Sequence, residues 1–98
     1  MGLRAYVHTK HDIQYGECHF SWRREEVYDW LIDHGVNVYG GECSNEWEID
    51  KDSLRSLKPE EISDFSTEDG VLSGEDMDAF VSECLAAPTG DYAYVSWF

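Results

Sequence analysis

The sequence SGEDMDAFVSECLA, residues 73–86, carries the clearest periodic pattern in the chain. Apolar side chains recur there at spacings of three and four residues, which is the spacing of one face of an α-helix. These side chains are Met77, Phe80, Val81, Cys84 and Leu85. Ser73 is a favourable residue for capping a helix N-terminus, and Pro88 cannot continue a helix. We therefore predict a helix over 74–86 with the apolar stripe buried.

The next segment, DYAYVSWF at 91–98, alternates with the two-residue period of a β-strand. Its two faces carry Ala93, Val95 and Trp97 on one side and Tyr92, Tyr94 and Phe98 on the other. Because both faces have apolar bulk, we expect this strand to lie in the interior of a sheet. If one edge of the segment were exposed, it would instead allow two chains to pair.

Three other segments, 3–8, 13–20 and 46–49, have strand-like patterns, and the first two suggest an N-terminal hairpin. A small antiparallel sheet with strands near 3–8, 13–20, 46–49 and 91–98 is therefore expected. The fold class is predicted to be α+β, as a single acidic domain over 1–98.

A second main helix is expected near 22–34, with Ser21 as its N-cap and Gly35 just after its end. Short helical turns are expected near 53–65, where Pro59 suits a first turn. The two main helices, near 22–34 and 74–86, would pack on the sheet.

Composition supports a folded domain with an unusual charge. The 98 residues are 42% hydrophobic and 14% aromatic, which is enough for a packed core. Asp plus Glu number 21 against 7 Lys plus Arg, so the net charge is −14. That balance disfavours direct binding to nucleic acid or to an anionic membrane, since both need a basic surface. No apolar run reaches the roughly 20 residues of a membrane span, and we expect no secretory signal.

The three cysteines, Cys18, Cys43 and Cys84, leave one thiol unpaired under any disulfide scheme. We expect reduced thiols and a cytoplasmic protein. The chain has no nucleophile elbow, phosphate-binding glycine loop or metalloprotease motif, so we expect neither an enzyme nor a cofactor.

Two metal hypotheses follow from local patterns. His8, His11, Cys18 and His19 could meet across the hairpin, but alternation along a strand sends neighbouring side chains to opposite faces, and we expect no zinc site. The loop 65–76 partly resembles an EF-hand calcium loop, with glycine at its sixth position. Its first position is Phe65 and its last is Asp76, where calcium loops have a carboxylate and a bidentate glutamate. A degenerate calcium module is therefore a minor alternative.

The acidic residues are unevenly distributed. Residues 42–83 hold fourteen acids against three bases, a net of −11. After Lys58 the chain has ten acids and no Lys, Arg or His. Self-repulsion on this scale costs folding free energy, whereas solubility needs a net charge of only about 2–8. This asymmetry favours a functional role for the charge.

Carboxylates on successive helix turns recur every ~4.5–6 Å, and B-DNA presents one charge per ~3.4 Å along each strand. The charge pattern is similar in kind to phage-encoded nucleic-acid mimics, such as anti-CRISPR and antirestriction proteins, and to immunity proteins that cap nuclease toxins. The resemblance implies a protein inhibitor that blocks the basic nucleic-acid-binding site of a nuclease or defence effector. The alternative is a generic acidic protein-interaction or adaptor domain.

Two clusters are the candidate partner-binding residues. The first comprises Asp64, Glu68, Asp69, Glu75, Asp76, Asp78 and Glu83. The second comprises Glu46, Glu48, Asp50 and Asp52. Trp47 lies between two of these glutamates, and we expect it to act as an aromatic anchor of the interface.

Overall fold

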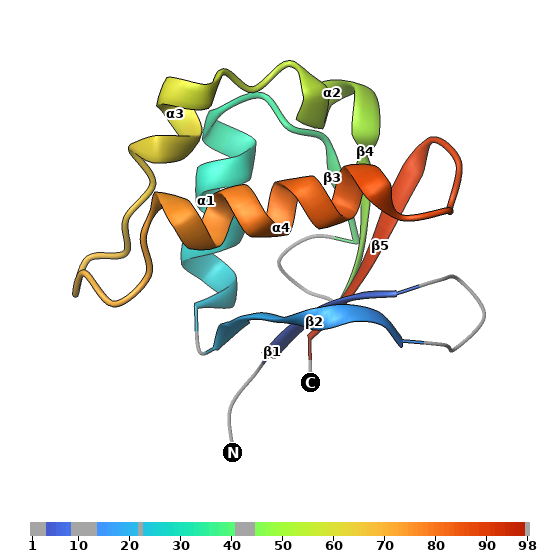
Figure 1. The fold of residues 1–98 in the computed structure, drawn as a ribbon, viewed down its shortest axis with the longest axis horizontal. Helices are drawn as coiled ribbons and strands as arrows, with labels where there is room; N and C mark the ends of the chain where they lie inside the picture. Colours follow the sequence, from blue (N-terminus) through green and yellow to red (C-terminus); the bar gives the residue numbers. More distant parts are fainter. Residues whose placement is uncertain (1–3, 9–13, 22, 41–44, 98) are drawn as a thin grey trace.

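The computed structural model describes residues 4–8, 14–21, 23–40 and 45–97, apart from the side chains at 4, 8, 14–18 and 21. In this part of the chain one antiparallel sheet has the strand order β2-β1-β5-β4-β3, and the helices pack against it (Figure 1). The predicted α+β fold is confirmed.

The strands lie close to their predicted positions. They are β1 (Arg4–His8), β2 (Gln14–Ser21), β3 (Val38–Tyr39), β4 (Glu46–Asp50) and β5 (Tyr92–Trp97). β5 pairs with β1 on one side and with β4 on the other, which confirms its interior position. The alternative of an exposed edge over 91–98 is wrong, because neighbouring strands occupy both edges of β5.

Alternation along the strands divides the sheet into a covered face and an open face. On β5 the covered face carries Ala93, Val95 and Trp97, each at most 1% exposed. On β4 the covered face carries Trp47 and Ile49. Trp47 stacks obliquely on Trp97, with ring centroids 5.1 Å apart. These side chains form the sheet half of the core.

A β-bulge in β2 places two successive side chains against the helices. Arg4 pairs with Ser21 and Tyr6 pairs with Cys18, so one residue of β1 faces two residues of β2 between these pairs. Both extra side chains reach Phe80, with ring centroids 5.6 Å from His19 and 5.0 Å from Phe20. The bulge therefore interrupts the alternation of side chains along β2.

The helix α4 (Gly74–Ala86) fills the centre of the fold (Figure 1). Its predicted stripe is buried, except that Leu85 is only half-buried. Ser73 is the N-cap, and its backbone N–H donates to Asp76 Oδ2 at 2.8 Å. Beyond the other end, the buried ammonium of Lys51 donates to the carbonyl of Ala87 at 2.6 Å. A positive charge here complements the negative end of the helix dipole.

The helix α1 (Arg24–Asp33) begins later than expected. Ser21 is not its N-cap, because Ser21 still pairs with Arg4 in the sheet, and Arg23 takes the N-cap position without a side-chain cap. Trp22 lies outside the described residues. The predicted end is confirmed, since Gly35 has a φ of 84° that favours glycine after a helix.

Two short helices, α2 (Lys51–Arg55) and α3 (Pro59–Ser63), replace the expected turns near 53–65. Asp50 caps α2 by accepting the backbone N–H of Asp52 at 3.2 Å. The helix α2 follows β4 directly, so Asp50 ends the strand and caps the helix. Proline starts α3 as predicted.

Candidate functional site: an acidic surface at one end of the helices

The packing of α3 on α4 builds an exposed acidic surface. A Cβ atom on Gly74 would lie 2.5 Å from the carbonyl oxygen of Ser63, so only glycine allows the two helices to approach this closely. The approach brings the end of α3 beside the first turns of α4. Of the exposed carboxylates in this region, four form what we call the helical acidic surface: Asp64, Glu68, Glu75 and Asp78.

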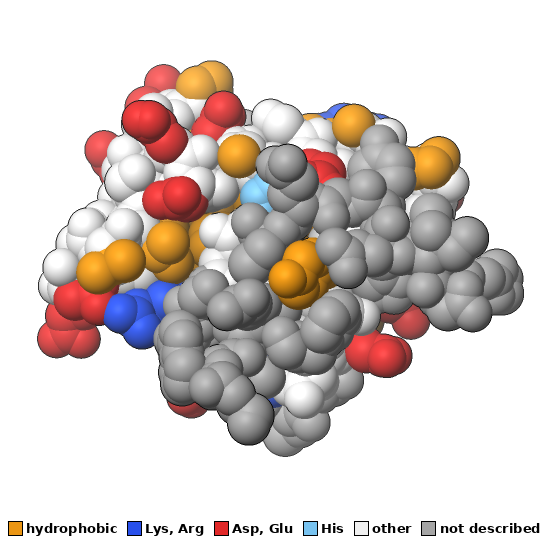
Figure 2. Space-filling model, turned by 60° about the horizontal axis from the view of Figure 1, so that its bottom comes forward, with side chains coloured by type: hydrophobic (Ala, Val, Ile, Leu, Met, Phe, Trp, Pro, Cys, Tyr) orange, Lys and Arg blue, Asp and Glu red, His pale blue; other side chains and the backbone are white. Residues whose placement is uncertain are grey.

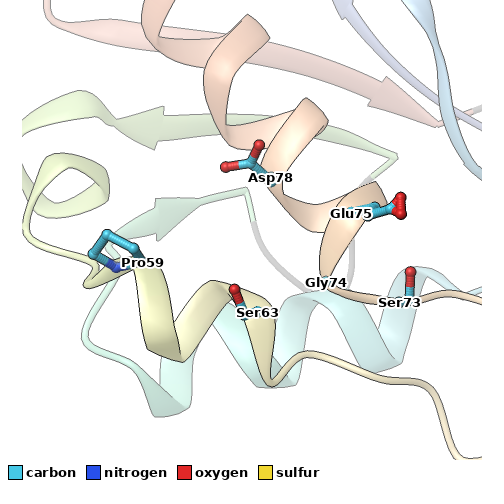
Figure 3. A pocket seen from close by; sticks show the side chains of 6 residues that line it. All are labelled: Pro59, Ser63, Ser73, Gly74, Glu75 and Asp78. Atoms are coloured by element: carbon cyan, nitrogen blue, oxygen red, sulfur yellow. The ribbon is translucent and has the colours of Figure 1, made fainter.

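A shallow depression of about 450 Å³ lies between α3 and α4. Pro59 and Ser63 line it from α3, and Glu75 and Asp78 line it from α4. Figure 3 shows Asp78 on the side nearer α3, whereas Glu75 points away. Glu75 lies in the first turn of α4 and Asp78 in the next turn, near the helix N-terminus where the dipole stabilises negative charge.

The loop between these helices is ordered by its own hydrogen bonds. Thr67 is 3% exposed, and its hydroxyl donates to Asp69 Oδ1 at 2.7 Å. The same hydroxyl accepts the backbone N–H of Leu72 at 3.1 Å, and Asp69 Oδ1 accepts that of Val71 at 3.1 Å. Arg23 also contacts the carboxylate of Asp69. These bonds fix the path of the loop, and the backbone N–H of Glu68 donates to the carboxylate of Glu26 on α1 at 3.1 Å.

The pKa of Asp69 is held below its usual range. The chief cause is the hydrogen bond from Thr67, followed by the backbone hydrogen bond from Val71; the guanidinium of Arg23 contributes less. Partial desolvation opposes these effects. Asp69 is therefore a charged structural group as well as a surface group.

Three of the seven acids predicted for the first cluster are used within the described fold. Asp69 holds the loop, and Asp76 caps α4. The carboxylate of Glu83 lies 2.5 Å from the imidazole of His19, and its side chain is only 18% exposed. The bulge in β2 turns His19 toward α4 and makes this pair possible. The remaining four acids are those of the helical acidic surface.

The calcium hypothesis finds little in this geometry. Phe65 is 3% exposed in the core, so the first loop position offers no ligand. One carboxylate oxygen of Asp69 and one of Asp76 already accept hydrogen bonds from the protein. Within the described ranges, no group of three or more His, Cys, Asp or Glu side chains could hold a metal ion. Of the zinc candidates, the side chains at 8, 11 and 18 lie outside the described residues.

Three of the four acids of the second predicted cluster lie on the open face of the sheet, whereas Asp52 is exposed on α2. Glu46 and Glu48 are exposed, and Asp50 is half-buried. Trp47 points to the opposite face and is 1% exposed, so it is not the surface anchor that we expected. Its flanking glutamates are exposed because a strand alternates its faces.

Three cations near these acidic surfaces are engaged within the fold. Lys51 is 3% exposed and faces the end of α4. Arg55 binds Asp52 at 2.9 Å, and Arg23 contacts Asp69. Figure 2 shows acidic side chains along the upper and left margins of one face, with only small patches of Lys and Arg.

Sequence reasoning did not find two features of these surfaces. Lys51 was counted among the charges of an acidic segment, although it is buried. The exposure of Tyr92 was also not predicted. The sequence assigned Tyr92 to one face of its strand, but the pairing of the strands determines which face is open. The only sequence signal for the burial of Lys51 was its position directly after a strand that carries Trp47 and Ile49.

No protein-family model, no curated protein and no solved structure matches the chain. Among the helices of the described residues, none has the length and apolar character needed to cross a membrane.

Proposed function

We propose that this protein is an acidic inhibitor that occupies the basic nucleic-acid-binding site of a nuclease or defence effector. The observation that carries the proposal is the helical acidic surface, in which α3, the following loop and α4 each present exposed carboxylates. No Lys, Arg or His follows Lys58 in the chain. The segment after Lys58 therefore contributes no positive charge of its own to this surface.

The physics of such a surface is electrostatic attraction. A groove lined with Lys and Arg attracts carboxylates as it attracts phosphates, and complementary potentials accelerate association and make it sensitive to salt. The surface is held by a close helix contact at Gly74 and by the bonded loop around Thr67. Pre-organised charges lose less entropy on binding than mobile ones do.

The biological role we propose is one of two cytoplasmic activities. The protein is either a phage anti-CRISPR or antirestriction protein, or an immunity protein against a nuclease toxin. An acidic adaptor domain would share the composition but would not require the helical acidic surface. The two functions therefore differ in how they respond to charge reversal on that surface.

The experiment compares three tagged proteins in a pull-down from bacterial lysate, washed at low and then at high salt. The first is the wild type, and the second carries Glu68→Lys, Glu75→Lys and Asp78→Lys. The matched control reverses three exposed acids on α1: Glu25→Lys, Asp29→Lys and Asp33→Lys. Both variants change the net charge equally.

The proposal predicts that a DNA- or RNA-binding enzyme elutes from the wild type and the α1 control in the salt step. Its recovery with the first variant should fall at least about tenfold, because close charge pairs across an interface carry large coupling energies. Equal recovery from all three proteins would support a non-specific acidic domain. Recovery of salt-resistant partners alone would contradict the proposal.

A further inference from the structure

The open face of the sheet carries a second surface whose chemistry differs from that of the helical acidic surface. Tyr39 on β3 is 53% exposed, and Tyr92 on β5 is 37% exposed. Their rings meet edge to face across β4, with centroids 6.0 Å apart. Two exposed aromatic rings, inclined at 65° to each other, form an aromatic platform at this end of the sheet.

Carboxylates of β4 border this platform through the strand register. Glu48 pairs with Tyr39, and Asp50 pairs with Tyr92. Directly paired residues in an antiparallel sheet lie on the same face, with Cβ atoms about 4.5–5.5 Å apart. The pKa of Tyr92 is raised, chiefly by Tyr39 and then by partial desolvation and by Asp50.

These carboxylates have no salt bridge with a cation of the described chain. The adjacent Lys51 points inward to Ala87, and Arg55 binds Asp52. The platform thus combines aromatic rings with carboxylates that form no salt bridge among the described residues. A nucleic-acid base could stack on such rings, but its phosphates would be repelled by the flanking carboxylates.

We propose that Tyr39, Glu48, Asp50 and Tyr92 form a docking surface for an arginine side chain presented by a partner protein. A guanidinium is planar, stacks on aromatic rings and donates to carboxylates in a fork geometry. Lysine offers the same charge without the planar fork. This surface shares no residue with the helical acidic surface, and its role does not rest on the inhibitor function.

The test uses nuclear magnetic resonance titration of the isotope-labelled full chain with two capped peptides. One peptide has two arginines spaced by glycines, and the other has lysines in their place. The arginine peptide should shift the amide signals of Tyr39, Glu48 and Tyr92 in particular. The lysine peptide should bind about two- to fivefold more weakly, because lysine lacks the planar stacking and the bidentate fork of a guanidinium.

Tyr92→Leu keeps apolar bulk but removes the aromatic face, and it should weaken arginine-peptide binding about two- to fivefold. Tyr39→Leu provides a second, independent test of the same platform. The variant with Glu68→Lys, Glu75→Lys and Asp78→Lys should keep its binding, which separates this inference from the inhibitor proposal. Three results would each overturn the inference. Both peptides could bind equally, both tyrosine variants could bind the arginine peptide as the wild type does, or the peptide could shift only amide signals of the helices.

Discussion

Asp69 shows how one carboxylate can serve the fold while lying on an acidic surface. It accepts from a buried hydroxyl and a backbone amide and contacts an arginine 46 residues away. Charge reversal at this position would therefore disturb the loop as well as the surface. For that reason the functional variants above leave Asp69 unchanged.

Asp69→Asn should lower the free energy of unfolding below that of the wild type. This loss should be larger at neutral pH than at low pH. The folded pKa of Asp69 is below the unfolded value of about 3.9. Its charge therefore stabilises the fold above that value, and the benefit is lost as pH falls through the folded pKa. Asparagine retains an acceptor oxygen, so the comparison isolates the charge.

The measurement for Asp69 is the free energy of unfolding by denaturant at several pH values for both proteins. The difference between wild type and variant should be largest near pH 7. It should shrink steadily as the carboxylate of the wild type becomes protonated. A difference that stays constant, or grows, in acid would contradict the role assigned to this charge.

Phe80→Ala should destabilise the protein by about 3–5 kcal/mol. Phe80 is fully buried and contacts the rings of Phe20 and His19. Truncation would remove buried area and leave a cavity between α4 and β2. Denaturant unfolding monitored by tryptophan fluorescence measures the loss, and a change below about 1 kcal/mol would show that the helix face is misplaced.

Residue environments were predictable where periodicity is strong and unpredictable where a distant partner decides. The burial of Met77, Phe80 and Cys84 follows from helix spacing alone. The alternation of β4 also placed Trp47 with Ile49 on one face, but the acidic neighbours of Trp47 suggested exposure. The pair between Glu83 and His19 spans 64 residues, and no local pattern reveals it.

At the scale of elements, the junction of α3 and α4 offers the sharpest test, because two effects have opposite signs. Gly74→Ala should raise helix propensity by up to about 1 kcal/mol. The new Cβ would instead meet the backbone of Ser63 and Ile62, both within 2.8 Å. We expect the clash to dominate, with a net loss of about 1–3 kcal/mol.

The matched control is Ser82→Ala at an exposed site of the same helix. It should change the free energy of unfolding by less than about 0.5 kcal/mol. Thermal unfolding of both variants gives the comparison. A Gly74→Ala protein more stable than the wild type would mean that α3 and α4 are not held this closely, and the helical acidic surface would lose its geometric basis.

Element boundaries were harder to predict than element types. Ser21 has the chemistry of an N-cap, but β2 extends through it and α1 starts at Arg24. Sheet pairing with a distant strand overrides a local capping preference, because the pairing satisfies the backbone hydrogen bonds first. The bulge in β2 also depends on the pairing of β2 with β1, so the sequence of 13–20 alone did not predict it.

For the whole molecule, a net charge of −14 predicts that salt stabilises the fold. Raising sodium chloride from about 0.02 to 0.5 M shortens the screening length and weakens repulsion among exposed carboxylates. The melting temperature should rise, and it should rise less in the variant with Glu68→Lys, Glu75→Lys and Asp78→Lys. A melting temperature that falls with salt would indicate that attractive ion pairs dominate instead.

The net charge was evident from the sequence, but its arrangement was not. A tertiary contact with His19 engages Glu83 and a local capping box engages Asp76, whereas Asp64 and Asp78 remain exposed. They also separate the acids of β4 from those of the helices. One charged segment of sequence therefore becomes two surfaces with different chemistry.

The most direct test of the inhibitor proposal is competition between this protein and duplex DNA, or single-stranded RNA, for the enzyme recovered in the salt step. The proposal predicts mutually exclusive binding, in which the apparent Kd for the protein rises in proportion to added nucleic acid. The variant with Glu68→Lys, Glu75→Lys and Asp78→Lys should fail to displace nucleic acid. A ternary complex in which the protein and nucleic acid bind together, with unchanged affinities, would contradict the proposal.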